Sequence, residues 1–172
     1  MGVRLLPLSI AELSAHALEL ERDAAARFRD YAVRMREIGE EKTAEAFEEL
    51  TREQDEEVRK LEADAGERRP SELSPWEYVW RLTYMPEKLE HAARLVPLSA
   101  REALQLALLS KRRAEAFYID VSDHARDDVV RARAAEMIAD ERRQVQYLEW
   151  LLNAHLREER DALLSGPGDS PM

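Results

Sequence analysis

Apolar residues recur every three or four positions along four long stretches of the chain, which is the period of one face of an α-helix. The first stretch covers about Ser9 to Ile38. The apolar face of this predicted helix, which we call its seam, consists of Leu13, Ala17, Leu20, Ala24, Phe28, Tyr31, Met35 and Ile38. Ser9 and Glu12 have the spacing of a capping box, and Gly39 is placed to end the helix in a left-handed conformation. The pattern therefore predicts a first helix over about residues 9–38.

A second helix is predicted almost immediately afterwards, from about Glu40 to Ala65, with Gly66 as its end. Its seam contains Ala46, Phe47, Leu50, Val58 and Leu61. Because the link at Gly39 is so short, the first two helices should form an antiparallel hairpin.

The second half of the chain repeats this arrangement. A third helix begins at the Ser99/Glu102 capping box and runs to about His124, and a fourth spans roughly Asp127 to Leu163. Their seams are Leu104, Ala107, Leu108, Ala114, Phe117, Tyr118 and Val121, and then Val130, Ala134, Met137, Ile138, Val145, Leu148, Leu151 and Leu152. Two antiparallel hairpins joined by one long crossover predict an all-α, ferritin-like four-helix bundle.

The crossover, residues 67–97, holds four of the prolines and a group of aromatic residues. We expect a short helix here that packs across the bundle, carrying Trp76, Tyr78, Trp80 and Tyr84. The 172 residues suit one domain, which we place at 1–164. Residues 165–172 are rich in Gly, Pro and Ser and are expected to form a disordered tail.

The amino-acid composition excludes several classes of partner and site. The chain has 26 Lys and Arg against 36 Asp and Glu, a net charge of −10, which argues against nucleic-acid partners because phosphates require a basic surface. It has no Cys, which excludes disulfides, thiolate zinc sites, iron–sulfur clusters and a cysteine nucleophile. No stretch approaches the roughly 20 apolar residues of a membrane span, and no secretory signal is evident, so a cytoplasmic protein with no membrane partner is expected.

The two predicted hairpins carry related polar residues. Glu21 begins a Glu-x-x-Ala-x-x-x-Phe pattern, and Lys111, 90 residues later, begins Lys-x-x-Ala-x-x-x-Tyr. The second helix has Leu-x-x-Glu-x-x-Glu ending at Glu56, and the fourth has Ile-x-x-Glu-x-x-Gln ending at Gln144, 88 residues later. In a duplicated hairpin, equivalent positions face each other. We therefore expect these polar side chains to meet at one height along the bundle axis, which we call the polar level. They are Glu21, Glu53, Glu56, Lys111, Glu141 and Gln144.

Such a level has chemical consequences. Carboxylates inside a bundle must be protonated, paired or bound to metal, because an isolated buried charge is very costly. Helical bundles build two-metal carboxylate sites from Glu on facing helices together with Glu-x-x-His motifs. The i, i+3 spacing places both side chains of such a motif on one face. The candidate metal ligands are therefore Glu21, Glu53, Glu56, Glu141 and Gln144.

Over roughly residues 9–155 the chain resembles the rubrerythrin-like branch of the ferritin-like superfamily. The resemblance is carried by Glu21-Arg22-Asp23-Ala24 with Phe28, by Phe47 to Glu53, by Ala114-Glu115-Ala116-Phe117-Tyr118, and by Glu141 before Leu148. Members of that family typically bind two irons and act on peroxide or store iron. The resemblance thus implies one or two iron ions and a non-haem iron oxidoreductase or iron-handling activity. Since the chain lacks the Cys of a rubredoxin module, electrons would come from a separate donor protein.

The chain departs from the family at several ligand positions. Glu56 and Gln144 stand where the family has the motif's His, and Lys111 stands where a carboxylate equivalent to Glu21 is expected. Glu56 can still ligate through oxygen, whereas Gln144 is a weaker, neutral ligand. Glu115, four residues after Lys111, is a possible extra ligand, and the alternative is an ordinary surface Glu.

Two hypotheses follow for the function. In the first, Glu21, Glu53, Glu56 and Glu141 hold iron, and the protein reduces peroxide or handles iron. In the second, the Lys111 ammonium replaces the metal, and the bundle is a non-catalytic structural or interaction protein. A homodimer is expected in both cases, because bundles with aromatic crossovers often expose an apolar face. The position of Lys111 relative to the Glu side chains discriminates between the two.

Overall fold

The computed structural model describes residues 9–65 and 97–166. Within these ranges the chain forms four helices and no strand. They are α1 (Ile10–Glu37), α2 (Glu41–Ala65), α5 (Ala100–His124) and α6 (Asp128–Leu164). The expected crossover helix, the C-cap at Gly66 and the tail beyond residue 166 lie outside the described residues.

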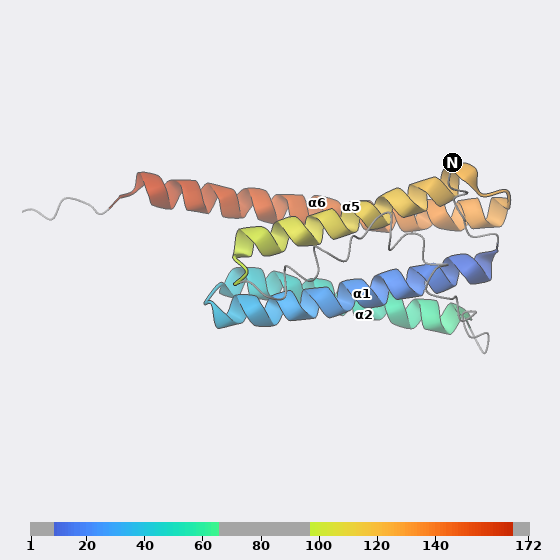
Figure 1. Ribbon diagram of the computed structural model, residues 1–172, viewed down its shortest axis with the longest axis horizontal. Coiled ribbons are helices and arrows are strands. Elements are labelled where there is room, and N and C mark those ends of the chain that lie inside the picture. Colours follow the sequence, from blue (N-terminus) through green and yellow to red (C-terminus); the bar gives the residue numbers. More distant parts are fainter. Residues whose placement is uncertain (1–8, 66–96, 167–172) are drawn as a thin grey trace, which may run out of the picture.

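The helices form two antiparallel hairpins, each a layer of the bundle (Figure 1). α1 pairs with α2 in one layer and α5 with α6 in the other, while the contacts between the layers are fewer. α6 is the longest helix, with 37 residues, and its C-terminal end extends past the other three. This arrangement confirms the predicted four-helix bundle.

Side-chain caps account for where α1, α5 and α6 begin. Ser9 accepts a hydrogen bond from the Glu12 amide at 3.2 Å, and Ser99 with Glu102 forms a complete capping box. Asp127 accepts from the Val129 and Val130 amides and so starts α6. These caps satisfy amide groups that have no partner within the helix.

Gly39 separates α1 from α2 with a φ of +79°, the left-handed conformation that the sequence predicts for it. The neighbouring prediction for Ile38 is wrong. Its side chain is 52% exposed, because α1 ends at Glu37 and Ile38 already belongs to the turn.

The apolar core consists of two clusters, one at each end of the bundle. The first is built around Phe28, Tyr31 and Phe47, and the Phe47 ring contacts the rings of the other two. The second is built around Leu13, Phe117, Tyr118 and Val121. Apart from Ile38, every apolar seam residue predicted for α1, α2, α5 and α6 is buried or partly buried. The predicted amphipathic faces are therefore the ones that pack.

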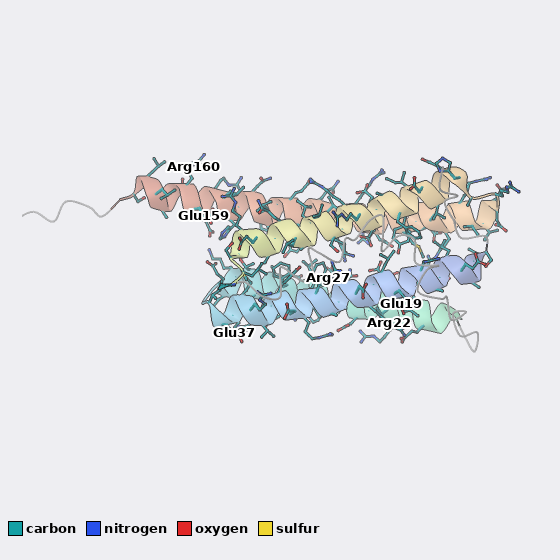
Figure 2. The ribbon with its side chains drawn as sticks, in the orientation of Figure 1. Glu19, Arg22, Arg27, Glu37, Glu159 and Arg160 are labelled. Atoms are coloured by element: carbon teal, nitrogen blue, oxygen red, sulfur yellow. The ribbon has the colours of Figure 1, made fainter. Side chains whose placement is uncertain are left out.

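Charged side chains cover the outer faces of the helices. Arg22 and Glu37 on α1 and Arg160 on α6 are examples (Figure 2). Many form exposed ion pairs between neighbouring helices, such as Arg29 with Asp55 at 3.0 Å. No helix in the two described ranges combines the length and the apolar character needed to cross a bilayer.

Candidate functional site

Each of the four helices places a polar side chain that is at most 5% exposed at the boundary between the two apolar clusters. Glu21, Gln54, Lys111 and Glu141 are 5%, 1%, 2% and 3% exposed. In every helix, the residues before and after this position belong to different clusters. We call these four residues the polar layer. It lies between the two apolar clusters of the core.

Lys111 is the centre of the polar layer. Its Nζ lies 3.2 Å from Oε1 of Glu141, 3.2 Å from Oε1 of Gln54 and 3.5 Å from Oε2 of Glu21. An ammonium group has three N–H donors, and three acceptors from three helices surround it here. The ammonium also lies 5.9 Å from the centre of the Phe28 ring, within the range of a cation–π contact.

The surroundings of Lys111 keep it charged. Burial by itself would lower the pKa of the ammonium, but the charges of Glu141 and Glu21, and the hydrogen bonds to them, more than offset that effect. The pKa of Lys111 therefore lies above its ordinary value. A buried lysine that retains its charge in this way serves as the cation for the nearby carboxylates.

Glu141 is in the opposite situation. Burial, reinforced by the charge of Glu21 and opposed by Lys111, raises the pKa of Glu141 well above its ordinary range. Two carboxyl groups around one ammonium cannot both ionise at low cost, so one of them is driven towards the neutral form. Only Oε1 of Glu141 is bonded to Lys111, and Oε2 is buried without a hydrogen-bond partner among the described residues.

Tyr118 and Gln144 extend the polar layer. The Tyr118 hydroxyl donates to Oε1 of Glu21 at 3.5 Å, and burial followed by the charge of Glu21 raises the pKa of this phenol well above its usual value. Gln54 donates from Nε2 to Oε1 of Gln144 at 2.7 Å, and Gln144 in turn donates to Oε2 of Glu53 at 3.5 Å. A chain of amides thus connects Lys111 to the surface.

A cavity of about 300 Å³ lies beside the polar layer, and its walls are mostly residues of α2 and α6. The buried side chains of Glu21, Glu141 and Tyr118 line it, as do the exposed Glu53 and Glu56. The cavity therefore runs from solvent towards the carboxylates that surround Lys111.

The structure brings only part of the predicted metal-ligand set into the core. Glu21 and Glu141 are buried beside Lys111, as expected. The expectation that Glu53 and Glu56 share this level inside the bundle is wrong, because both are exposed and only line the cavity. Gln144 is half-buried and bonded to Gln54.

The possible extra ligand Glu115 has another partner. It is half-buried and accepts a hydrogen bond from Nε of Arg142 at 2.7 Å. Across residues 9–65 and 97–166, no three His, Asp or Glu side chains are grouped to hold a metal ion. Because the ammonium of Lys111 lies between the two buried carboxylates, the residues as placed do not fit a di-iron centre.

Gln54 is the site residue that the sequence reasoning missed. The Leu-x-x-Glu-x-x-Glu pattern pointed to Glu53 and Glu56, but Gln54 is the buried member of this turn. The signal was present in the seam of α2, where the step from Leu50 to Gln54 and the step from Gln54 to Val58 are both four residues. An apolar seam with one polar member marks a buried polar position.

Comparison with known proteins supports the fold. No protein-family model and no curated protein matches the chain. Among solved structures, the chain is similar to an uncharacterised conserved protein from Magnetospirillum magnetotacticum, with a TM-score of 0.72 and 23% sequence identity. The match covers 85% of this chain and 95% of that one. At this identity the likeness establishes the fold alone, an all-α, ferritin-like four-helix bundle.

Proposed function

We propose that this protein is a rubrerythrin-like member of the ferritin-like superfamily in which Lys111 takes the place of the metal. In this proposal the protein works without iron, as a non-catalytic structural or interaction protein of the cytoplasm. The observation that carries the proposal is the position of the Lys111 ammonium, 3.2 Å from Glu141 and 3.5 Å from Glu21. These carboxylates are the two candidate ligands inside the core.

Electrostatics explain why lysine and metal would exclude each other here. Two unit positive charges about 4 Å apart repel by about 4 kcal/mol at an effective dielectric constant of about 20, and a divalent ion doubles that repulsion. A metal bound by Glu21 and Glu141 would have to displace the Lys111 ammonium or deprotonate it. The raised pKa of Lys111 opposes the second route.

A second candidate function is iron binding with peroxide-reducing or iron-handling activity, supplied with electrons by a separate donor protein. It is favoured by one observation, namely that Glu21, Glu53, Glu56, Glu141 and Gln144 all line the same cavity. For this function, the exposed Glu53 and Glu56 side chains would have to turn inward and Lys111 would have to leave the carboxylates.

Iron loading separates the two candidates. The purified chain is incubated anaerobically with ferrous iron, freed of excess iron by gel filtration, and analysed for iron per chain. We expect far less than one iron per chain, and an increase in the Lys111→Glu variant, which restores a carboxylate at this position. About two irons per chain in the unmodified protein, lost in Glu53→Ala and retained in the surface control Glu62→Ala, would overturn the proposal.

An interaction role also requires a surface for association, and we propose that the protein forms a homodimer. The C-terminal part of α6 exposes large apolar side chains, with Trp150 at 59%, Leu163 at 84% and Leu164 at 79%. Sedimentation equilibrium over a range of concentrations tests this. We expect a dimer that weakens when Leu163 and Leu164 are both changed to Ser, and a monomer at every concentration would contradict it.

A further inference from the structure

We propose that the C-terminal end of α6 docks in a groove on the α1/α2 layer of a second copy of this chain, and that the second copy makes the same contact in return. This rests on the homodimer proposed above and names the surface that receives Leu163 and Leu164. Three observations support it: a helix end that the other described helices leave uncovered, a groove between α1 and α2, and opposite charges on the two surfaces.

The end of α6 has an apolar surface that the other described helices do not cover. Glu159 lies 4.0 Å from Arg101 of α5. Beyond Glu159, no hydrogen bond or ion pair joins α6 to another helix of the described chain, and the bonds that remain are local to α6. Leu163 and Leu164 follow in this part of the helix and are 84% and 79% exposed. Exposed leucines on one helix are the anchors with which a helix enters a groove.

A groove of about 580 Å³ lies between α1 and α2, and all of its lining residues belong to these two helices. Ala32 and Val33 give it an apolar floor, and the Val33 side chain is 55% exposed. Because no residue of the α5/α6 layer lines the groove, it stays open on the outside of its own hairpin. An open groove with an apolar floor suits the apolar side chains of an incoming helix.

The groove and the end of α6 lie towards the same end of the bundle. α6 extends past the other helices at the end where α1 turns into α2, and the groove uses the last turns of α1 (Figure 1). Four of the eight exposed large apolar side chains in the described ranges are gathered at this end, namely Val33, Ile38, Leu163 and Leu164. Two copies packed end to end about a two-fold axis bring each α6 end to the groove of the other copy, which makes a closed dimer.

The two surfaces carry opposite charges. In a chain whose net charge is −10, basic side chains outnumber acidic ones in the groove, with Arg29, Arg36 and Arg52 against Glu37 and Glu48. Arg52 is exposed and has no ion-pair partner among the described residues. Residues 158–172 contain four acidic residues and one basic residue. The last turn of α6 has no basic residue to offset the negative end of its helix dipole. Opposite charges of this kind favour the encounter and fix its orientation.

Disulfide cross-linking tests the contact, because the chain has no Cys of its own. Val33→Cys and Leu163→Cys chains are mixed at a dilution that separates dimers, concentrated, oxidised with diamide and analysed by non-reducing electrophoresis. We expect a disulfide-linked dimer in this mixture and little of it when either variant is oxidised alone. In the control mixture Val129→Cys, at a position that is 64% exposed near the start of α6, replaces Val33→Cys. Equal yields of linked dimer in the two mixtures, or none in either, would overturn the proposal.

A charge reversal in the groove gives an independent test. Arg52→Glu should weaken dimerisation about tenfold in sedimentation equilibrium, because it places a carboxylate against the acidic end of α6. The control Arg59→Glu makes the same change at another exposed position of α2, outside the groove. Equal dimer affinities of these two variants would overturn the proposal.

These measurements separate this inference from the proposals on which it rests. A dimer that forms without the link between positions 33 and 163 would overturn the groove as the docking site and leave the homodimer standing. A monomer at every concentration would overturn both. The iron content of the protein is measured independently, so the assignment of Lys111 can stand or fall on its own.

Discussion

Glu21 and Lys111 stand at equivalent positions of the two hairpins, and their side chains form a buried ion pair with 3.5 Å between Oε2 and Nζ. The two copies of the repeated pattern thus carry opposite charges at equivalent positions, and the fold places these two charged side chains in contact. Glu141, the second carboxylate at this level, lies 3.2 Å from the same ammonium. The charge balance of the core depends on this one lysine.

Removing the ammonium should destabilise the fold strongly. Lys111→Met leaves Glu21 and Glu141 buried without a counter-charge, which costs about 3–5 kcal/mol in comparable pairs. Adding Glu21→Gln and Glu141→Gln to this variant removes the unbalanced charges and should recover most of the lost free energy of unfolding. Urea denaturation at neutral pH measures both effects. The control Lys42→Met breaks an ion pair whose lysine is 88% exposed, so the urea midpoint of this variant should not change. An unchanged midpoint in Lys111→Met would contradict the prediction.

Stability should fall as the pH rises above the ordinary carboxyl range. Burial raises the pKa of Glu141, so the folded chain holds this proton more tightly than the unfolded chain. The resulting stabilisation is complete below the unfolded pKa of about 4.3 and is lost as the pH rises through the folded pKa, by at most about 1.4 kcal/mol per pH unit.

Comparison with a variant that cannot ionise isolates the Glu141 contribution. Urea midpoints measured between about pH 5 and pH 8 should fall less steeply in Glu141→Gln than in the unmodified chain. The raised pKa of Lys111 does not interfere, because its contribution is present throughout this range and is lost only at alkaline pH. Identical pH slopes in the two proteins would show that Glu141 keeps an ordinary pKa.

The phenol of Tyr118 should resist ionisation until the protein unfolds. Burial and the neighbouring charges of Glu21 and Glu141 raise its pKa well above that of a free tyrosine. In an alkaline titration followed by tyrosinate absorbance, Tyr118→Phe should remove the last step, which coincides with unfolding. Tyr147→Phe should remove an earlier step, because that side chain is only partly buried. Loss of the hydrogen bond to Glu21 should also cost Tyr118→Phe about 1 kcal/mol.

Substitutions at two adjacent residues of α2 should differ sharply in how much they lower the free energy of unfolding. Gln54 is 1% exposed and bonded to both Lys111 and Gln144, so Gln54→Leu should cost about 2 kcal/mol for the loss of a hydrogen bond to a charged group. Glu53 is exposed, and Glu53→Leu should change the unfolding midpoint little. Thermal unfolding of the two variants side by side measures the difference. A larger loss in Glu53→Leu would mean that α2 is rotated from the orientation described here.

The helices were predictable because each carries its own signals. The Ser99/Glu102 capping box and the left-handed Gly39 stand where the sequence predicts them. The buried seams follow from the same periodicity, since the spacing that defines an amphipathic face also selects the residues that pack. The pairing of Lys111 with the carboxylates was one of two alternatives, and the repeat of 90 residues already placed Glu21 opposite it.

The site was less predictable because a motif fixes residue types and spacing but not the rotation of its helix. Turning α2 by one residue exchanges Glu53 for Gln54 at the inner position, and only the packing of Leu50, Val58 and Leu61 decides which is buried. A carboxylate there would have added a third buried negative charge around Lys111. The neutral amide avoids this cost and still offers the ammonium an acceptor.

The unlike charges of Glu21 and Lys111 also determine which halves of the molecule can associate. Two α1/α2 hairpins packed on each other would place carboxylate against carboxylate at this position, and two α5/α6 hairpins would place ammonium against ammonium. The second hairpin carries Glu141 as well as Lys111, so only the first hairpin lacks a cation of its own at this position. It obtains one from the second hairpin of the same chain or of another chain that has exchanged halves. The polar layer therefore sets a pairing rule for the first hairpin: expressed separately, it should bind the second hairpin rather than another copy of itself.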